Sequence, residues 1–289
     1  MNDRLAFRAM VAVAGLFLFC LGCLLAASLR TLWLTTWLWM VCCSLLMSQM
    51  AMPMPTASWP VSIAAILAGA LVTLMVCRSL FTAWTLWRTT QRLIQSTQVA
   101  RLPQPPIVAR LAAELKLTDS LIVVANPTPF SFCYGLWRPR ICLSWGLVDL
   151  LTDHELEAVL RHEAYHLGRR EPLRMAVAIC LSRFFFFVPL LAELRDRYLA
   201  EKELAADAAA VAQTGRAALA GALHKLITLP QSLVLPPLAT VAGLSVTAQR
   251  VDRLINPAAQ PGGTPSWRSI IITGVMFGLS CLLMVTGLL

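Results

Sequence analysis

Two histidines separated by three residues, in the segment His162-Glu163-Ala164-Tyr165-His166, are the residues most able to do chemistry in this chain. On a helix, side chains four positions apart lie on one face about one turn apart, so both imidazoles can reach a single metal ion. Glu163 directly follows the first histidine, where its carboxylate can take a proton from a metal-bound water. The pattern indicates a hydrolytic zinc site with His162 and His166 as ligands and Glu163 as general base. The alternative is a surface helix that carries two histidines among charged residues.

A catalytic zinc site has three protein ligands and one open position, and two histidines with one glutamate are a common set. The alanine-rich segment 198–211 is predicted to be a helix that places Glu203 and Asp207 on one face. Glu203 is the predicted third ligand, with Glu201 as the next candidate. Asp207 is predicted to hold a ligand histidine in its tautomer without touching the metal. The alternative is a solvated acidic face of the helix.

The helix that carries the two histidines has clear start and stop signals. Thr152 followed by Glu155 is the pattern of a capping box, and Gly168 is a plausible end. Apolar residues recur at helical spacing between these signals and predict a buried, amphipathic helix; they are Leu156, Val159, Leu160 and Leu167. We therefore expect the ligand pair to be held rigidly.

Three short strands are predicted before this helix. Residues 121–125 form a β-branched apolar run, and residues 130–134 and 140–143 are short runs separated by a turn with glycine and proline. Helix 107–117 is predicted to precede them. An edge strand beside a zinc helix can pair with an extended substrate through its backbone. A hairpin that only packs the domain is equally compatible with the sequence.

Composition places the chain in a membrane. The 289 residues are 58% hydrophobic and 13% charged, with a mean hydropathy of +0.69. Apolar runs long enough to span a bilayer explain these values; they cover residues 9–29, 32–50, 61–77 and 270–289. Four buried core helices in one short chain are the less favoured interpretation. Small residues at positions 64–69 predict close helix packing and a homo-oligomer.

Basic residues suggest the orientation of these spans. The block from Arg78 to Arg268 is rich in lysine and arginine, whereas the loop 51–60 carries no charge. Because basic loops stay inside, we expect this block in the cytoplasm and the N-terminus outside, although Arg4 and Arg8 favour the opposite orientation. The net charge of +9 fits contact with anionic lipid headgroups, and no aromatic-basic pattern indicates nucleic-acid binding.

These observations predict the domain organisation. Residues 1–88 form a unit of three transmembrane helices, 89–106 a proline-rich linker, 107–268 a cytoplasmic domain and 269–289 the fourth transmembrane helix. Within the domain, residues 173–194 are predicted to form a helix apposed to the membrane, because charges flank the apolar run and Val188-Pro189 interrupts it.

Several motifs in order resemble the BlaR/MecR-type membrane metallopeptidases. They are NPTPFSFCYGLWRPRICLSWGL, LTDHELEAVLRHEAYHLGRREP, FFFFVPLLAELRDRYLAEKELAADAAAV and QRVDRL, which together cover roughly residues 100 to 255. The resemblance implies a mainly α membrane protein with an α+β zincin-like metallopeptidase domain between the third and fourth of four transmembrane helices. It implies zinc as cofactor, the site residues His162, Glu163, His166, Glu203 and Asp207, and a substrate strand at Phe130, Ser131 and Phe132.

The chain departs from the family pattern in two places. Glu171 stands where the family commonly has an aspartate beyond the second histidine, which is a mild change. The β-lactam-sensing members continue after the fourth span into an extracellular penicillin-binding domain, and the printed sequence ends at Leu289. We therefore expect no such sensor domain and do not carry the ligand-sensing role over.

The sequence predicts an integral membrane zinc endopeptidase of the bacterial cell membrane that cleaves a cytoplasmic or membrane-associated protein. A transcriptional repressor in a signalling pathway would be one such substrate. Beside zinc, Tyr198 and His224 are candidates for stabilising the oxyanion. The alternatives are a housekeeping membrane protease of the HtpX or prenyl-protein type, and a non-catalytic receptor that binds zinc structurally. The absence of a suitable fourth cysteine or histidine nearby favours an open, catalytic site.

Overall fold

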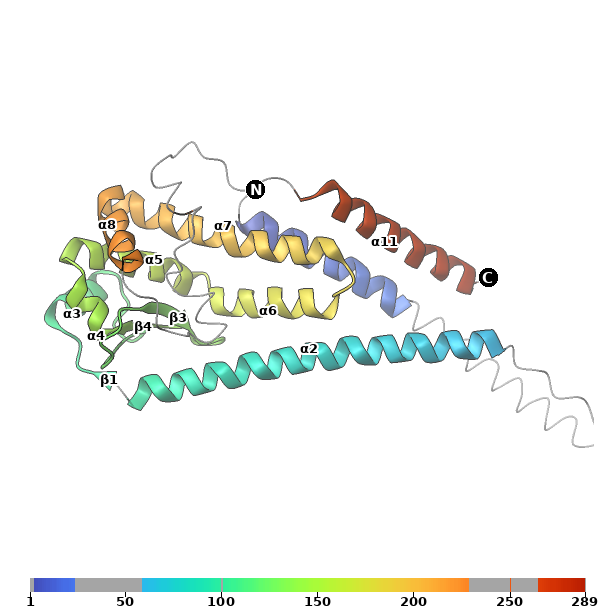
Figure 1. Ribbon diagram of the computed structural model, residues 1–289, viewed down its shortest axis with the longest axis horizontal. Coiled ribbons are helices and arrows are strands. Elements are labelled where there is room, and N and C mark those ends of the chain that lie inside the picture. The colour runs from blue at the N-terminus through green and yellow to red at the C-terminus, as the bar shows by residue number, and fades with distance from the viewer. Residues whose placement is uncertain (1–2, 24–58, 100, 229–249, 251–264, 289) are drawn as a thin grey trace, which may run out of the picture. The chain divides into compact units, whose positions relative to one another are not determined.

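The computed structural model describes residues 3–23, 59–99, 101–228, 250 and 265–288. This part of the chain is mainly helical and contains one small mixed sheet (Figure 1). It divides into two compact units; the first comprises residues 1–8, 80–180 and 194–264, and the second comprises 9–79, 181–193 and 265–289. All the predicted site residues belong to the first unit.

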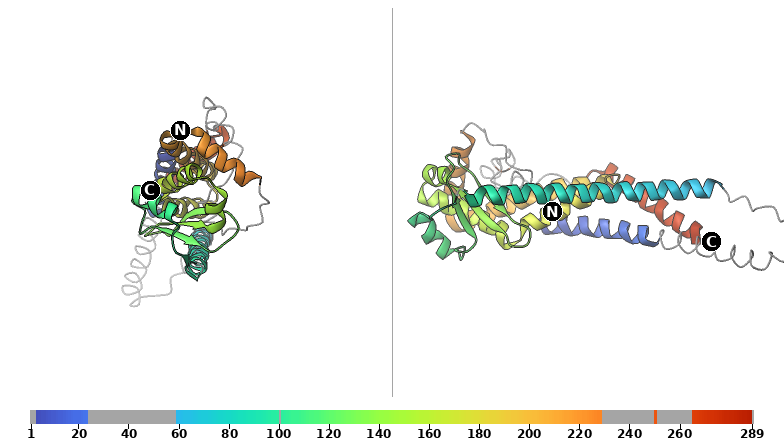
Figure 2. Two further views of the ribbon diagram at one scale, coloured as in Figure 1. Left: turned by 90° about the vertical axis from the view of Figure 1, so that its left-hand side faces the viewer. Right: turned by 90° about the horizontal axis from the view of Figure 1, so that it is seen from below.

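The sheet of the first unit has four strands in the order β1-β2-β4-β3 (Figures 1 and 2). The strands are β1 (Arg101–Leu102), β2 (Leu121–Val124), β3 (Ser131–Tyr134) and β4 (Arg140–Ser144). β2 and β4 are parallel, and β3 pairs with β4 as an antiparallel hairpin in which Phe132 lies opposite Cys142. The three predicted strands are confirmed, and β3 is an edge strand of the described sheet. The sequence analysis missed the two-residue β1.

Helices pack around this sheet to form the core of the first unit. They are α3 (Pro106–Glu114), α4 (Trp145–Leu150), α5 (Asp153–Gly168) and α8 (Arg216–Ile227). α5 contacts both β3 and α8. A buried apolar cluster joins α3, β2, β4 and α5; it includes Val108, Leu111, Leu121, Val123, Ile141, Leu143, Leu156, Val159 and Leu160. Helix α5, which carries the histidines, is therefore fixed against the sheet.

The predicted capping box of α5 is present. The Thr152 backbone N–H donates to Glu155 Oε2 at 2.8 Å, and the Glu155 N–H donates to Thr152 Oγ1 at 3.4 Å. The last helical residue is Gly168, as predicted. Glu155 also accepts a hydrogen bond from Lys225 of α8 at 2.7 Å. The residues that start α5 therefore also tie it to a second helix.

Two helices follow α5 where a membrane-apposed helix and an acidic helix were predicted. α6 spans Glu171–Phe184, and α7 spans Pro189–Thr214. The predicted break at Val188-Pro189 is confirmed, because Pro189 begins a helix at a position where its missing N–H costs nothing. The predicted end of the first segment at residue 194 differs from the structure, since residues 189–194 are continuous with the helix that carries Glu203.

The predicted linker 89–106 is mostly helical. α2 runs without interruption over Trp59–Val99. Between Pro60 and Pro103 the sequence contains no proline that would stop a helix. Only the short stretch that contains β1 and Pro103 separates α2 from α3. The polar residues after Trp87 therefore belong to a helix, which the prediction of a linker did not specify.

Two helices whose side chains are described are long and apolar enough to cross a membrane, where four were predicted. They are Asp3–Cys23 and Gly69–Arg92, the latter within α2. α11 (Trp267–Leu288) contains a shorter apolar stretch, Trp267–Leu282, among its described side chains. The predicted span 32–50 and the side chains of the small residues 64–68 lie outside the described residues.

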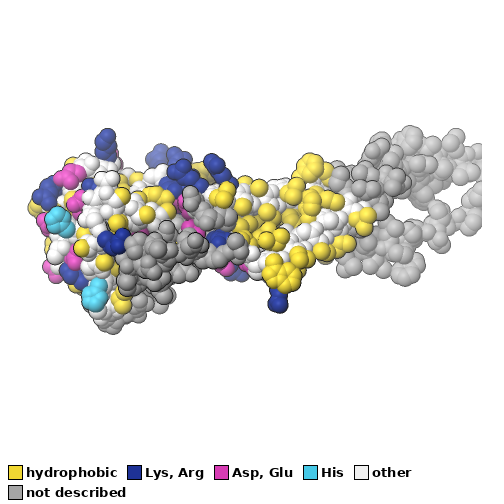
Figure 3. Space-filling model, turned by 90° about the horizontal axis from the view of Figure 1, so that it is seen from above, with side chains coloured by type: hydrophobic (Ala, Val, Ile, Leu, Met, Phe, Trp, Pro, Cys, Tyr) yellow, Lys and Arg dark blue, Asp and Glu magenta, His cyan; other side chains and the backbone are white. Residues whose placement is uncertain are grey.

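The helices of the second unit expose many large apolar side chains, and hydrophobic side chains dominate their surface in Figure 3. They include Leu16, Phe19, Leu71, Leu74, Val275, Leu279 and Leu282. Charged side chains gather on the first unit in the same view. An exposed apolar surface of this kind suits contact with lipid tails.

The start of the chain is part of the first unit. Asp3 Oδ2 lies 2.6 Å from Arg169 Nη2, directly after α5, and the Asp3 side chain is buried. The Phe7 ring lies 5.2 Å from the ring of Tyr198 in α7. These contacts join the first described residues of the chain to the end of α5 and to α7, the two helices that carry the site. The apolar runs by themselves carried no information on this pairing.

Candidate metal centre

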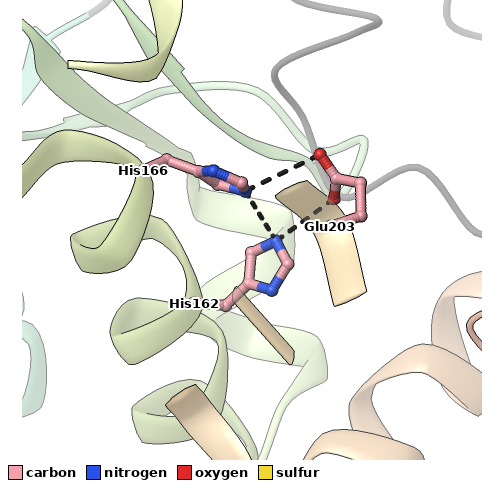
Figure 4. Close-up of side chains that lie close together, drawn as sticks. All are labelled: His162, His166 and Glu203. Carbon is pink, nitrogen blue, oxygen red and sulfur yellow. Dashed lines mark hydrogen bonds and ion pairs between the residues drawn. The ribbon is translucent and has the colours of Figure 1, made fainter. Parts of the chain in front are cut away.

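Three predicted ligands converge in the first unit (Figure 4). His162 and His166 come from successive turns of α5, and Glu203 comes from α7. The two imidazole Nε2 atoms lie 3.1 Å apart. His162 Nε2 lies 3.4 Å from Glu203 Oε2, and His166 Nε2 lies 3.7 Å from Glu203 Oε1. The potential ligand atoms of all three residues lie within 4.8 Å of one another.

This donor set fits a transition-metal ion such as zinc. All three side chains are buried, and among the described residues Glu203 Oε2 accepts no hydrogen bond. Two ring nitrogens and a carboxylate that face each other across a buried space are arranged for a cation at their centre. Nitrogen and oxygen donors of this kind are common zinc ligands.

Asp207 holds the first histidine from behind. His162 Nδ1 lies 2.9 Å from Asp207 Oδ1, on the ring edge opposite the other ligands. Burial alone lowers the pKa of His162, but Asp207 and Glu203 outweigh it and raise that pKa to about 9. A metal ion bound at His162 would therefore take the place of a proton on Nε2, while Nδ1 would keep its proton toward Asp207.

A buried lysine accompanies the ligand carboxylate. Lys202 Nζ donates to Glu203 Oε1 at 2.7 Å, and the Lys202 side chain is 1% exposed. Burial alone raises the pKa of Glu203, but Lys202 and the two histidines outweigh it and hold that pKa well below its usual value. Burial lowers the pKa of His166 well below its usual value. Glu203 is therefore ionised and His166 neutral, which are the forms that bind a metal.

Glu163, the predicted general base, is buried and hydrogen-bonded to the sheet. It is fully buried on α5, and its Oε1 accepts a hydrogen bond of 2.8 Å from Ser131 Oγ of β3. Its Oε2 accepts no hydrogen bond from the described residues. Burial raises the pKa of Glu163 to about 7. One oxygen is thus held in place while the other remains available for a proton, at a pKa suited to proton transfer near neutral pH.

The predicted substrate strand is divided between two environments. Ser131 points toward α5 and reaches Glu163. Phe130 and Phe132 pack their rings together at 5.5 Å in a separate apolar cluster with residues of β2 and β4. Side chains alternate along a strand, so only the middle residue reaches the site. The two phenylalanines therefore support the sheet and contribute no side chain to the metal centre.

The two suggested oxyanion stabilisers lie elsewhere. The Tyr198 hydroxyl donates to the buried carboxylate of Glu171, which Arg169 Nε also approaches at 3.5 Å. The pKa of Tyr198 is raised, because burial and the nearby Glu171 disfavour the phenolate. His224 of α8 is exposed. Glu171, the residue that departs from the family pattern, is therefore part of a buried network behind the end of α5.

Sequence reasoning missed two buried cations of the site, Lys202 and Arg250. Lys202 stands between Glu201 and Glu203 in a segment that was interpreted from its acidic residues alone. Arg250 Nε and Nη2 bind Asp207 Oδ2 and Oδ1 at 2.8 and 2.6 Å. The motif QRVDRL contained this residue, but the sequence did not show which partner it would find.

Comparisons with known proteins agree with this geometry. A family model described as BlaR1 peptidase M56 matches residues 25–253. Two curated relatives are named Protease HtpX homolog 2. The one from Methanosarcina mazei is 28% identical over 106 residues, which are 36% of this chain and 35% of the relative. The one from Methanosarcina acetivorans is 27% identical over 106 residues, with the same shares.

The match to these two relatives is partial, since it spans about a third of their length, 35% in each case. The family model, in contrast, covers most of the chain and includes all three converging ligands. The resemblance seen in the sequence is thereby confirmed. This protein belongs to the M56 family of BlaR1-type metallopeptidases, with His162, His166 and Glu203 as its metal-binding group.

Proposed function

We propose that the protein is an integral membrane, zinc-dependent endopeptidase that cleaves a cytoplasmic or membrane-associated protein. The observation that carries this proposal is the convergence of His162, His166 and Glu203 around one point. Glu163, which follows His162 in the sequence, is buried as well. Exposed apolar helices in the second unit support the membrane location.

Zinc is the proposed metal because two imidazoles and one carboxylate leave a position open for water. When bound, zinc polarises a carbonyl and lowers the pKa of its water toward about 7. Glu163 takes the proton of that water on the oxygen that Ser131 does not hold, and passes it to the leaving amine. Asp207 keeps His162 in the tautomer that presents Nε2 to the metal.

β3 is the proposed binding strand for the substrate backbone. It is an edge strand of the described sheet, and its Ser131 contacts the general base. A peptide added to this edge would pair through main-chain hydrogen bonds. Within residues 130–132 the proposal involves the backbone of Ser131, because the Phe130 N–H and C=O already bond Ser144 at the end of β4. The side chains of the two phenylalanines take no part, since they pack inside the sheet cluster.

The N-terminus and the first unit are proposed to lie on the same, cytoplasmic side of the membrane. The buried pair of Asp3 and Arg169 supports this arrangement. The basic residues of the central block favour the cytoplasm as that side.

Two kinds of protein substrate have specific support. The BlaR1-type family match favours one regulatory protein, such as a transcriptional repressor. The similarity to proteins named Protease HtpX homolog 2 favours a second candidate, a housekeeping role on many membrane proteins. Labelling of new protein N-termini in cells with and without the enzyme separates them, since the first predicts one cleaved protein and the second predicts many.

The mechanism is tested on purified full-length protein in detergent. Glu163→Gln is expected to keep one zinc per chain and to abolish cleavage of a general protein substrate such as casein. Glu157→Gln is the matched control, because Glu157 lies on the same helix but is not a metal ligand. Its Oε1 lies 2.8 Å from Arg161 Nη2. Undiminished proteolysis by the zinc-loaded Glu163→Gln protein would refute the assigned role. Absence of zinc from the wild type after supplementation would refute the metal centre.

A further inference from the structure

Arg250 is a buried arginine that reaches the metal centre from a distant part of the sequence. Its side chain is 1% exposed, and it makes two hydrogen bonds to Asp207, from Nε to Oδ2 at 2.8 Å and from Nη2 to Oδ1 at 2.6 Å. Its third nitrogen, Nη1, lies 3.5 Å from Glu203 Oε2. One guanidinium thus contacts the carboxylate behind His162 and also approaches a ligand carboxylate.

The double hydrogen bond restricts what Asp207 can do. A planar guanidinium fork fixes both the position and the rotation of a carboxylate, whereas a single donor fixes only one oxygen. Asp207 Oδ1 is shared between Arg250 Nη2 and His162 Nδ1, at 2.6 and 2.9 Å. The orientation of the imidazole therefore depends on the guanidinium through the carboxylate between them.

The buried charge of Asp207 also makes the His162 ring dependent on Arg250. Asp207 is 5% exposed, and a buried carboxylate without a cation would be strongly unfavourable. Paired with Arg250, it remains a hydrogen-bond acceptor for His162 with its charge balanced. The arginine is thus well placed to hold Asp207, and through it the His162 ring with its Nε2 facing His166 and Glu203.

We propose that Arg250 is a positioning residue of the metal centre, which sets metal affinity by clamping Asp207 and, through it, the His162 ring. This inference rests on the proposed zinc site. It differs from a purely structural ion pair, which would stabilise the fold without changing how tightly the ligands hold a metal.

The test measures metal binding by full-length protein in detergent, by chelator competition for Zn²⁺ and by the visible absorption spectrum of the Co²⁺-loaded form. Arg250→Gln is expected to weaken zinc binding about 10- to 100-fold and to change the Co²⁺ spectrum. Arg250→Lys keeps the charge without the fork, and we expect it to recover only part of the affinity. Arg216→Gln, at the exposed start of α8, is the control and should bind zinc as the wild type does.

A double-mutant cycle shows whether Arg250 acts through Asp207 or directly on Glu203. In the Asp207→Asn background, Arg250→Gln should change zinc affinity less than about twofold, because the clamped carboxylate is already gone. A further loss of tenfold in that background would overturn the proposal and assign the effect to Glu203. Wild-type zinc affinity with an unchanged Co²⁺ spectrum in Arg250→Gln would also overturn it.

A folding defect would not end the test. If Arg250→Gln cannot be purified, Arg250→Lys is compared with the wild type, and the double variant is compared with Asp207→Asn. Wild-type affinity in Arg250→Lys would then overturn the need for the fork. If the wild type itself bound no zinc, the proposed zinc site would have failed, whereas a wild type with one zinc and an indifferent arginine would refute this inference alone.

Discussion

Lys202 and Glu203 are neighbours in sequence that form a buried ion pair inside the metal centre. The lysine bonds one oxygen of the carboxylate while both histidines lie near it. In the absence of a metal ion, Lys202 is therefore an important source of positive charge for Glu203. A bound divalent cation would supply much of the positive charge that balances the Glu203 carboxylate.

Replacing this lysine should affect the two metal states differently. Lys202→Met is expected to destabilise the zinc-free protein by about 3 kcal/mol or more, because it leaves a buried carboxylate without its close cation. With zinc bound, we expect a much smaller loss, so zinc should raise the melting temperature more in the variant than in the wild type. Thermal unfolding with and without zinc measures this difference.

The control for Lys202→Met is Arg161→Met, which removes the partner of Glu157 at the surface of α5. That arginine side chain is 26% exposed, so a loss below about 1 kcal/mol is expected in either metal state. Equal destabilisation of the zinc-free and zinc-loaded Lys202→Met protein would contradict the assigned role of the lysine.

Residue spacing predicted the centre of the site but not its surroundings. His162 and His166 share a helix, and Glu203 and Asp207 share another, so helical geometry alone pairs them correctly. The contact between Ser131 and Glu163, and that between Arg250 and Asp207, join different elements. Such contacts arise from tertiary packing, which no local pattern encodes.

At the scale of elements, the start of α4 is capped by Ser144 and packs closely against the loop at Pro127. Ser144 Oγ accepts a hydrogen bond from the Leu147 N–H at 3.2 Å and caps this short helix. A Cβ on Gly146 would lie 1.9 Å from the Pro127 carbonyl oxygen. The sequence analysis missed α4, because six residues containing a glycine give no clear helical periodicity.

This close approach predicts a severe effect of adding one methyl group. Gly146→Ala should destabilise the protein by several kcal/mol, about 3 or more, because the backbone of the loop at Pro127 must move. Gly168→Ala is the control, since a Cβ there has no neighbour within 4 Å among the described residues. Alanine has the higher helix propensity, so the control should be neutral or stabilising by about 0.5 kcal/mol. Denaturant unfolding in detergent compares the two, and equal stabilities would contradict the packing.

The link between α5 and α8 should respond to pH. Burial alone raises the pKa of Glu155, but hydrogen bonds from Lys225 and Thr152 outweigh it and lower that pKa below its usual value of 4.5. A lowered pKa in the folded state stabilises the fold above about pH 4.5, and this contribution is lost as the pH falls through the lowered value.

Glu155→Gln is therefore expected to cost about 1 kcal/mol near neutral pH and to match the wild type in strongly acidic solution. Unfolding free energies measured from pH 7 down to the acid limit test this expectation. Glu157→Gln, on the outer face of the same helix, should differ from the wild type by less than about 0.5 kcal/mol throughout. A constant difference between Glu155→Gln and the wild type at all pH values would contradict the prediction.

At the scale of the whole molecule, apolar composition predicts which segments are able to cross a membrane but not their topology. Hydropathy identifies segments that can cross a bilayer, and the described residues contain two of them. It does not show which side each end occupies. The buried pair of Asp3 and Arg169, two residues far apart in the sequence, supports our proposal that the N-terminus and the first unit lie on the same side.

A topology measurement follows from this pair. A peptide tag placed before Met1 should become protease-accessible in the same vesicle orientation as the exposed loop near Trp137, whose side chain is 78% exposed. Accessibility in opposite orientations would contradict the shared side.

Asp3→Asn should weaken the attachment of the first helix, because it leaves the largely buried Arg169 with less countercharge.

The origin of the metal ligands from α5 and α7 has a consequence for the lifetime of the protein. The chain runs through the whole of α6 between His166 and Glu203, so a bound ion would act as a cross-link that closes a long loop. By analogy with a disulfide across a loop of this size, the cross-link would stabilise the folded state by about 4 kcal/mol. Chains that fail to obtain metal would then be the ones most readily degraded. Metal supply would govern how much of this peptidase a cell keeps, in addition to whether it is active.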